Sequence, residues 1–404
     1  MSKSLGNVLD PVDVLDGITL PELHQKLQEG NLGKDEVGKA EKYQKKAFPQ
    51  GIPEVGADAL RFSLINYTQA SGADINFDVK TMHGYRRFCN KIYQATKYVL
   101  GKLGDDFAPR KDSSPTGHES LPEKWILAKM NTAAKQTNNA LEEREFSRAT
   151  QTIYRYLYDE LFDIYIENSK TIISDGTPEE ARSATDTLYT ALESGLRLMS
   201  PFMPFLTEEL WQRLPRRPDD NTNSITIADY PEYDQAFDDP ASEKAYELVL
   251  GCSKGFRSLT AEHGIKDQAT GYIAPLDRTA HATASAQLGA IKSLSGKTPI
   301  TITILDTGAD IPSGCDVYPI SAAANAFLEI RDRIQDPAKQ AEKIRSRLEE
   351  AKKDREEADA LQTELRKMSD KAEALENAAS RKRDADAKVK AFEETASMFE
   401  ALKI

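Results

Sequence analysis

The first six residues hold the pattern with the most direct chemical potential. Lys3 lies between Ser2 and Ser4, and Gly6 follows closely. A lysine on a flexible loop can bring a compact positive charge to a phosphate group, while neighbouring hydroxyls hydrogen-bond as the loop changes shape. Taken alone, a Ser/Lys stretch after an initiating methionine is the simpler interpretation, because motifs this short have many false matches.

Basic residues elsewhere allow two interpretations. Tyr85-Arg86-Arg87 and Lys91 place positive charge beside an aromatic ring, which suits contact with a nucleic-acid backbone or a solvated helix face equally well. The stretch from Lys339 to Arg355 is also rich in basic side chains, and it fits either contact with a polyanion or a salt-bridged coiled-coil surface.

Other reactive side chains are sparse. Cys89, Cys252 and Cys315 are far apart, and His263 and His281 have no visible ligand partners, so we expect neither a disulfide scaffold nor a metal site. The net charge of −12 excludes a global attraction to nucleic acid but permits local basic faces. We find no apolar run of transmembrane length and no signal peptide, and we therefore expect a cytoplasmic protein without a membrane partner.

The elements that position these residues begin with an irregular segment. Residues 1–55 are broken by many glycines and prolines and are expected to form loops with short helices such as Leu20–Gln28. Helices are predicted over Asp58–Ile65 and Tyr85–Leu100, and the latter places Cys89 in a packed interior rather than in a nucleophilic site. Residues 101–119 are predicted to be a linker.

From residue 121 the spacing of apolar residues predicts an antiparallel helical bundle. Its helices are expected at Trp125–Leu141, Ser147–Ser169, Pro178–Met199 and Thr207–Leu214. A short strand is predicted at Ser224–Ile227. Five large aromatic residues are expected to be core rather than base-stacking groups: Trp125, Tyr154, Tyr156, Tyr158 and Tyr165.

The last third is predicted to be mixed and then purely helical. An α-helix is expected at Ser242–Leu259 and another at Ala280–Leu294. Strand-like segments are Gly271–Ala274, Pro299–Leu305, and a hairpin that pairs Asp316–Ile320 with Phe327–Arg331. Beyond Asp336 one apolar stripe runs from Ile344 through Leu361 to Met368, and another runs from Val389 to Leu402. They predict two helices folded back on each other, with the turn within Lys367–Ser380.

Several of these segments resemble class I aminoacyl-tRNA synthetases. Met1–Gly6 is similar to the Lys-Met-Ser-Lys-Ser signature without its first lysine, and Asn7–Pro11 is similar to the stretch that follows it. Gly56–Phe62 resembles a helix of the stem-contact region. Phe88–Ala95 and Pro201–Trp211 resemble two elements of the anticodon-binding bundle. The motifs follow the family's order and spacing, which makes chance a poor explanation.

The insert between Gly17 and Glu54, together with the C-terminal hairpin, is similar to eukaryotic cytosolic valyl-tRNA synthetases. No nucleotide-binding Rossmann half and no editing domain follow from the sequence, so the resemblance implies the C-terminal part of a longer enzyme that begins inside the signature. The implied fold is mainly α, with stem-contact helices, an antiparallel helical bundle, a small α/β domain and a C-terminal helical hairpin that forms a coiled coil. The implied regions are 1–115, 116–240, 241–335 and 336–404.

The resemblance implies ATP-dependent attachment of valine to tRNA-Val in the intact enzyme, with this chain alone inactive. Lys3 would be catalytic, and Ser2, Lys3 and Ser4 would contact ATP, a substrate expected with Mg²⁺; no tightly bound cofactor is expected. Four residues are predicted to contact tRNA: Arg144, Arg148, Lys343 and Arg347. The alternative is a non-catalytic tRNA-binding or assembly module, whose hairpin binds a protein partner.

Overall fold

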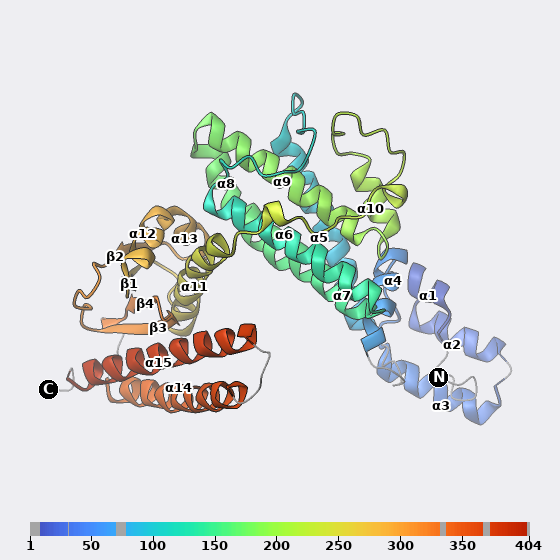
Figure 1. Cartoon of the computed structure of the whole chain (residues 1–404). Coiled ribbons are helices and arrows are strands. Elements are labelled where there is room, and N and C mark those ends of the chain that lie inside the picture. The colour runs from blue at the N-terminus through green and yellow to red at the C-terminus, as the bar shows by residue number, and fades with distance from the viewer. Residues whose placement is uncertain (1–8, 31, 70–77, 332–336, 367–371, 402–404) are drawn as a thin grey trace. The chain divides into compact units, whose positions relative to one another are not determined.

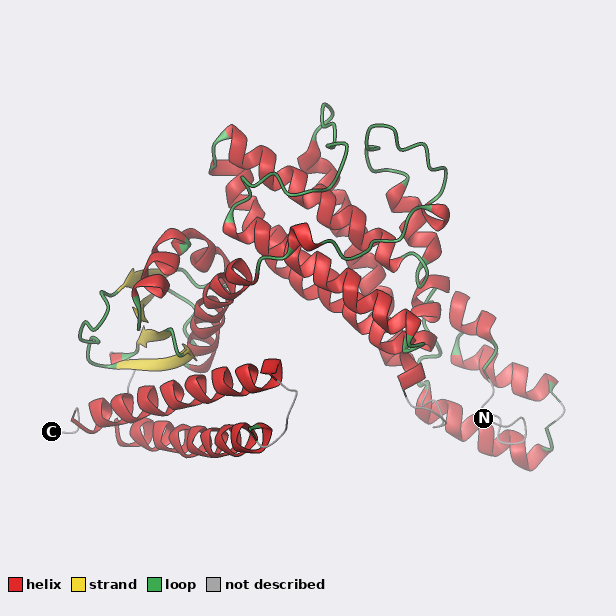
Figure 2. Ribbon diagram, viewed as in Figure 1, coloured by secondary structure: helices red, strands yellow, loops and turns green. Residues whose placement is uncertain are grey.

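The computed structural model describes residues 9–30, 32–69, 78–331, 337–366 and 372–401 (Figure 1). The chain divides into two compact units, Met1–Asp238 and Asp239–Ile404. Figure 2 shows that the described strands all belong to the second unit, whereas the first is built from helices and loops. Within the described ranges, no helix has the length and apolar character needed to cross a membrane.

The first unit begins with three helices, α1 (Pro11–Asp16), α2 (Leu20–Glu29) and α3 (Lys34–Ala47). Residues 1–55 were expected to form loops with short helices, but this segment is more helical than predicted, because α3 runs for 14 residues. Leu23, Phe48 and Ile52 form the small core beneath them. Gly51 has φ +83°, and a Cβ there would lie 2.2 Å from the Ile18 carbonyl oxygen, so the close pairing of residues 18 and 52 requires glycine.

The helices α4 (Ala57–Asn66) and α5 (Val79–Leu103) follow, with a 3₁₀ turn η2 (Tyr67–Gln69) after α4. Both extend the helices predicted from the sequence. Asp78 accepts hydrogen bonds from the Lys80 and Thr81 amides, which explains why α5 begins before the predicted residue 85.

The bundle comprises α6 (Leu121–Glu142), α7 (Phe146–Tyr154), η3 (Arg155–Tyr165), α8 (Ile166–Asp175), α9 (Pro178–Met199) and α10 (Pro204–Trp211). The predicted single helix Ser147–Ser169 is interrupted, because η3 is a π-helix. Its wider turn presses Leu157 against α9 at Gly195, where a Cβ would lie 2.5 Å from the Leu157 Cδ2 atom. The spacing of apolar residues in the sequence does not reveal such a change of pitch.

The end of the first unit contains two 3₁₀ turns, η4 (Ile225–Ile227) and η5 (Gln235–Phe237). The predicted strand at residues 224–227 is therefore wrong. Ser224 accepts from the Thr226 amide, while the Glu208 carboxylate accepts from the Ile225 amide, so side chains take the place of a neighbouring strand.

The second unit holds a four-stranded sheet in the order β2-β1-β4-β3. Its elements are α11 (Pro240–Glu262), β1 (Ala269–Pro275), α12 (Arg278–Ala286), α13 (Leu288–Leu294), β2 (Ile300–Ile304), β3 (Cys315–Ser321) and β4 (Ala324–Glu329). β1 and β2 are parallel, whereas β4 is antiparallel to both β1 and β3. The two strands of the predicted hairpin do pair, but the second begins at Ala324 rather than Phe327, so the turn is shorter and Val317 lies opposite Phe327. The predicted helix Ala280–Leu294 instead breaks at Gln287.

The chain ends in α14 (Pro337–Leu365) and α15 (Ala372–Ala401), which lie side by side (Figure 1). Ion pairs join Arg345 to Glu400 at 2.5 Å and Asp354 to Lys388 at 2.7 Å, so the helices are antiparallel as predicted. The predicted apolar stripe fails near its end, where Leu361 is 36% exposed and the adjacent residue is buried instead. Met368 and Leu402, also assigned to the stripes, lie outside the described residues.

Candidate functional site

The signature residues Ser2, Lys3 and Ser4 lie outside the described residues. The segment that follows them is firmly attached to the rest of the first unit. The amides of Val55 and Gly56 each donate a hydrogen bond of 3.1 Å to a carbonyl at the C-terminal end of α1. The C-terminal end of α1 is thus fixed relative to the start of α4.

Asp58 connects two of the motifs found in the sequence. It lies in the first turn of α4, and its carboxylate accepts from the Phe205 amide at 3.3 Å and from the Leu206 amide at 2.6 Å. These amides belong to the first turn of α10, where N–H groups have no partner within the helix. Arg61 adds a bond to the Pro201 carbonyl at 3.2 Å. Burial raises the pKa of Asp58, while the two amides oppose that rise.

The aromatic residues behave largely as the sequence predicted. Trp125, Tyr156 and Tyr165 are buried, which confirms their assignment to the core. Tyr154 and Tyr158 are half-buried and stack on each other with centroids 5.2 Å apart. Cys89 is also buried, and burial raises the pKa of its thiol to about 12, so the side chain packs rather than reacts.

The basic residues predicted on α5 prove to be partly engaged. The Lys91 ammonium lies 3.2 Å from the centroid of the Tyr158 ring and 2.5 Å from the Asp163 carboxylate. Arg86 reaches the Glu54 carboxylate at 3.4 Å. These contacts favour the structural interpretation of the patch at Lys91, where the charge is already neutralised.

The turn between α6 and α7 carries the two arginines singled out from the sequence. Arg144 adopts φ +60°, and the following amide, of Glu145, donates to the Ala140 carbonyl at 2.8 Å, so this residue occupies the left-handed position that usually holds glycine. Arg148 pairs with the carboxylates of Glu143 and Glu145. Among the described residues, Arg144 has no ion-pair partner.

The same turn exposes an aromatic ring that the sequence analysis missed. Phe146, the first residue of α7, is 43% exposed. It lies close in sequence to Arg144 and Arg148. The next residue, Ser147, donates a hydrogen bond of 3.0 Å from its hydroxyl to the Asn66 carbonyl and so fixes the start of α7 against the end of α4. An aromatic in an otherwise charged segment was the available signal.

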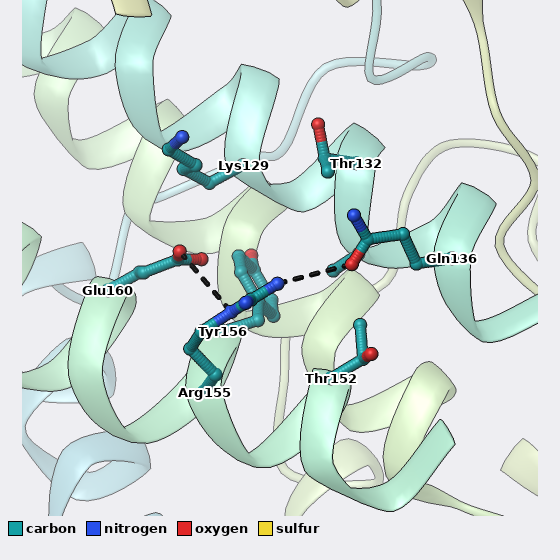
Figure 3. A pocket seen from close by; sticks show the side chains of 8 residues that line it. Lys129, Thr132, Gln136, Thr152, Arg155, Tyr156 and Glu160 are labelled. Carbon is teal, nitrogen blue, oxygen red and sulfur yellow. Dashed lines mark hydrogen bonds and ion pairs between the residues drawn. The ribbon is translucent and has the colours of Figure 1, made fainter. Parts of the chain in front are cut away.

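A polar hollow of about 230 Å³ lies on the bundle between α6 and the α7–η3 segment (Figure 3). Arg155 points across it and donates to the Gln136 side-chain oxygen at 3.1 Å, with Glu160 on its other side at 3.9 Å. Lys129 and Thr132 complete the rim. The lining offers both donors and acceptors, which suits the polar edge of a small ligand. Helical spacing alone gave no sign of it.

In the second unit, Lys343 and Arg347 point at acidic residues of the same unit. The Lys343 ammonium lies 2.5 Å from the Glu262 carboxylate, and Arg347 binds that carboxylate as well as Asp316, the latter at 3.5 Å. Burial alone would raise the pKa of Glu262, but the two cations hold it below its ordinary value. Both basic residues thus attach α14 to the C-terminal end of α11.

Asp316 is the centre of this network and is fully buried. Its Oδ1 atom accepts from the Val317 amide at 2.8 Å, whereas its Oδ2 atom accepts from the Gln340 side chain at 3.1 Å and lies 2.8 Å from the His263 Nε2 atom. Glu262, His263 and Asp316 are close enough together to suggest a cation site. The ammonium and guanidinium groups of α14 already supply the positive charge there.

Two sequence profiles of known families match the chain. The profile described as "tRNA synthetases class I (I, L, M and V)" matches residues 1–78, and the profile described as "Anticodon-binding domain of tRNA ligase" matches residues 123–274. The first includes α4 with Asp58, and the second includes the α6–α7 turn and the polar hollow.

Individual relatives agree with these profiles. The chain is 44% identical over 342 residues to "Valine--tRNA ligase, mitochondrial" of Saccharomyces cerevisiae, covering 85% of this chain and 31% of that protein. It is 46% identical over 329 residues to "Valine--tRNA ligase" of Schizosaccharomyces pombe, covering 81% and 33%. The human "Valine--tRNA ligase" is 41% identical over 345 residues, covering 85% and 27%. The chain therefore spans about a third or less of the length of these curated relatives.

A solved structure of a LeuRS–tRNA complex from Agrobacterium radiobacter matches 59% of this chain and 22% of its own chain, at 19% identity and a TM-score of 0.38, which is too low to establish a shared fold. The sequence matches are far stronger. One profile includes the motif Gly56–Phe62 and the other includes Pro201–Trp211, the two motifs that Asp58 connects. The chain belongs to the class I valyl-tRNA synthetase family.

Proposed function

We propose that this chain supplies the tRNA-binding part of a valine–tRNA ligase, and that the turn between α6 and α7 contacts the anticodon loop of tRNA-Val. The observation that carries the proposal is the combination at this turn of an exposed aromatic ring, Phe146, with an unpaired arginine, Arg144, inside the region matched by the anticodon-binding profile.

The chemistry of the turn suits a single-stranded RNA loop. Unstacked bases are recognised by stacking on aromatic rings or guanidinium planes and by hydrogen bonds to their edges. Phe146 offers the ring, while Arg148 is held in one orientation by Glu143 and Glu145. A non-glycine residue in the left-handed region costs about 1–2 kcal/mol, and Arg144 retains its side chain despite that cost. Strained backbone positions of this kind cluster at functional sites, which supports a role for Arg144.

The polar hollow between α6 and η3 supports the same proposal. Its volume of about 230 Å³ and its mixture of amide, guanidinium and carboxylate groups suit a base that leaves the stack. Gln136 and Arg155 are the side chains that would pair with it, once their mutual hydrogen bond opens.

For the complete reaction we propose the chemistry of the family. ATP, carried with Mg²⁺, and valine give valyl-adenylate and pyrophosphate, and the valyl group then passes to the terminal ribose of tRNA with release of AMP. Lys3 stabilises the charge that develops on the pyrophosphate side, and Ser2 and Ser4 shape the loop around ATP. We therefore expect Lys3→Ala, in an enzyme that contains this segment, to lower the kcat of adenylate formation more than it raises the KM for ATP.

We retain the four regions 1–115, 116–240, 241–335 and 336–404 as the functional division, with a cytoplasmic location. Each compact unit combines two of these regions. Lys343 and Arg347 remain candidate tRNA contacts, although their present partners are acids of the same unit. The comparisons do not favour the alternative assembly function over that of a ligase.

The decisive experiment is a fluorescence-anisotropy titration of the full chain with tRNA-Val and with a tRNA of another anticodon. We expect Phe146→Ala and Arg144→Ala to reduce the preference for tRNA-Val. Phe205→Ala is the matched control, because Phe205 is another exposed phenylalanine, at 67%, outside the turn. Equal binding of both tRNAs by the unaltered chain, or equal effects of the two phenylalanine variants, would contradict the proposal.

A further inference from the structure

Helix α3 has a strongly basic outer face that the sequence analysis did not anticipate. Its buried side is formed by Ala40 and Gln44. At 100° per residue, Lys39, Lys42 and Lys46 fall on the opposite side within an arc of about 60°, which also contains the exposed Asp35 of the first turn. All three are exposed. We call this set the lysine stripe.

The charges of the lysine stripe are exposed to solvent rather than held in ion pairs. Across the parts of the chain that the structure describes, no carboxylate forms an ion pair with Lys39, Lys42 or Lys46. Some other lysines of the first unit do pair, as Lys111 does with Asp219 at 3.2 Å and Lys170 with Glu167 at 2.5 Å, whereas Lys80, Lys97 and Lys124 form no ion pair within the described residues. A run of unpaired lysines in a chain of net charge −12 is a local departure from the overall balance.

Helix stability does not account for the stripe. Lysines in the last turn of a helix are favourable because of the helix dipole, and this explains Lys45 and Lys46. Lys39 and Lys42 lie earlier in α3, outside the reach of that effect. Tyr43 lies at one side of the stripe and is 49% exposed, so an aromatic ring accompanies the charges.

We propose that the lysine stripe binds the phosphate backbone of the same RNA whose anticodon loop contacts the α6–α7 turn; the inference rests on the proposed function. From Lys39 to Lys46 the stripe extends about 10 Å along the helix axis. Lysine ammonium groups are mobile point charges that neutralise phosphates without reading bases. The contact therefore contributes affinity and position, while the choice among tRNAs comes from elsewhere.

The test is the salt dependence of tRNA binding by the full chain carrying Lys39→Gln and Lys42→Gln together. Glutamine keeps the helix propensity and most of the length of lysine, and circular dichroism checks that α3 persists. Each phosphate contact contributes about 0.7–0.9 to the slope of log Kd against log salt, so the slope should fall by about 1.4–1.8. At 0.1 M salt this corresponds to a loss of up to about 25- to 60-fold in affinity.

The variant should weaken tRNA-Val and other tRNAs equally. Lys39→Arg with Lys42→Arg should restore both affinity and slope, because the charge returns. The matched control is Lys111→Gln with Lys170→Gln, which removes the same charge from ion-paired lysines and should change the slope by much less.

The outcomes separate the two proposals. If the unaltered chain binds tRNA and Phe146→Ala reduces discrimination, but the lysine variant behaves like its control, the inference is wrong and the proposed function stands. If the lysine variant alone loses affinity, the stripe is supported and the anticodon turn is wrong. Absence of tRNA binding by the unaltered chain contradicts both. Unchanged tRNA binding with loss of binding to phosphatidylserine vesicles would overturn the inference in favour of a membrane surface.

Discussion

Replacing Arg347 by methionine tests whether the main role of this arginine is to attach α14 to α11 and β3 or to contact tRNA. Methionine preserves the long aliphatic part of the side chain but removes the guanidinium that contacts both Glu262 and the fully buried Asp316. The two carboxylates would then share a small volume with less positive charge to balance them. We expect the attachment of α14 to weaken.

The structure sets the size of the effect. Removing one member of a buried ion pair costs about 3–5 kcal/mol. The Arg347 and Glu262 side chains are 24% and 20% exposed, and Lys343 and His263 remain as partners, which reduces the cost. We therefore expect a loss of about 2–3 kcal/mol, below the range for a fully buried pair.

Hydrogen exchange followed by mass spectrometry measures this loss within α14 itself. When helix opening and closing are fast relative to exchange, a loss of 2–3 kcal/mol accelerates exchange by about 30- to 160-fold. Arg345→Met is the matched control on the same helix. Arg345 pairs with Glu400, but the side chains are 60% and 42% exposed, so about 0.2–1 kcal/mol and at most about a 5-fold change is expected.

Two results would refute this reasoning. Similar acceleration in the Arg347 and Arg345 variants would mean that the buried network adds nothing beyond a surface ion pair. A loss of tRNA affinity in Arg347→Met without faster exchange in α14 would show that the guanidinium serves RNA. The second result would also confirm the sequence-based prediction that Arg347 contacts tRNA.

Three further predictions follow from the same contacts. Asp58→Ala should lower the thermal midpoint of the first unit by leaving two amides of α10 unsatisfied, at a cost of about 1–3 kcal/mol measurable in calorimetry. Arg144→Gly should raise stability by about 1 kcal/mol, because φ +60° suits glycine, and should lower tRNA-Val affinity in the anisotropy titration; no gain in stability would contradict the strain. Because ion pairs depress the pKa of Glu262, its contribution is complete above 4.5 and disappears as pH falls below its folded value, so thermal melts by circular dichroism should show a loss toward pH 3 that Arg347→Met reduces.

The sequence by itself determined the family and most of the helices. The segments Gly56–Phe62 and Pro201–Trp211 were recognisable because each packs many constraints into a few residues, and the structure gives the reason, since Asp58 of one segment caps the helix of the other. The helix Pro178–Met199 was predicted to the residue because a capping box and a strong apolar face mark its limits. Local signals of this kind are legible without knowledge of the fold.

Tertiary structure alone decided what the charged side chains do. Lys343 and Arg347 remain candidates for RNA contact, and the acids that they meet are residues 262 and 316, too far away in the sequence for any periodicity to connect them. The lysine stripe of α3 is the reverse case, because within the described residues the fold brings no carboxylate within ion-pair distance of it. Apolar burial follows local helical period, whereas the free energy of an ion pair depends on which distant group the fold brings within a few ångströms. For that reason the helices could be predicted from the sequence, and the partners of their charges could not.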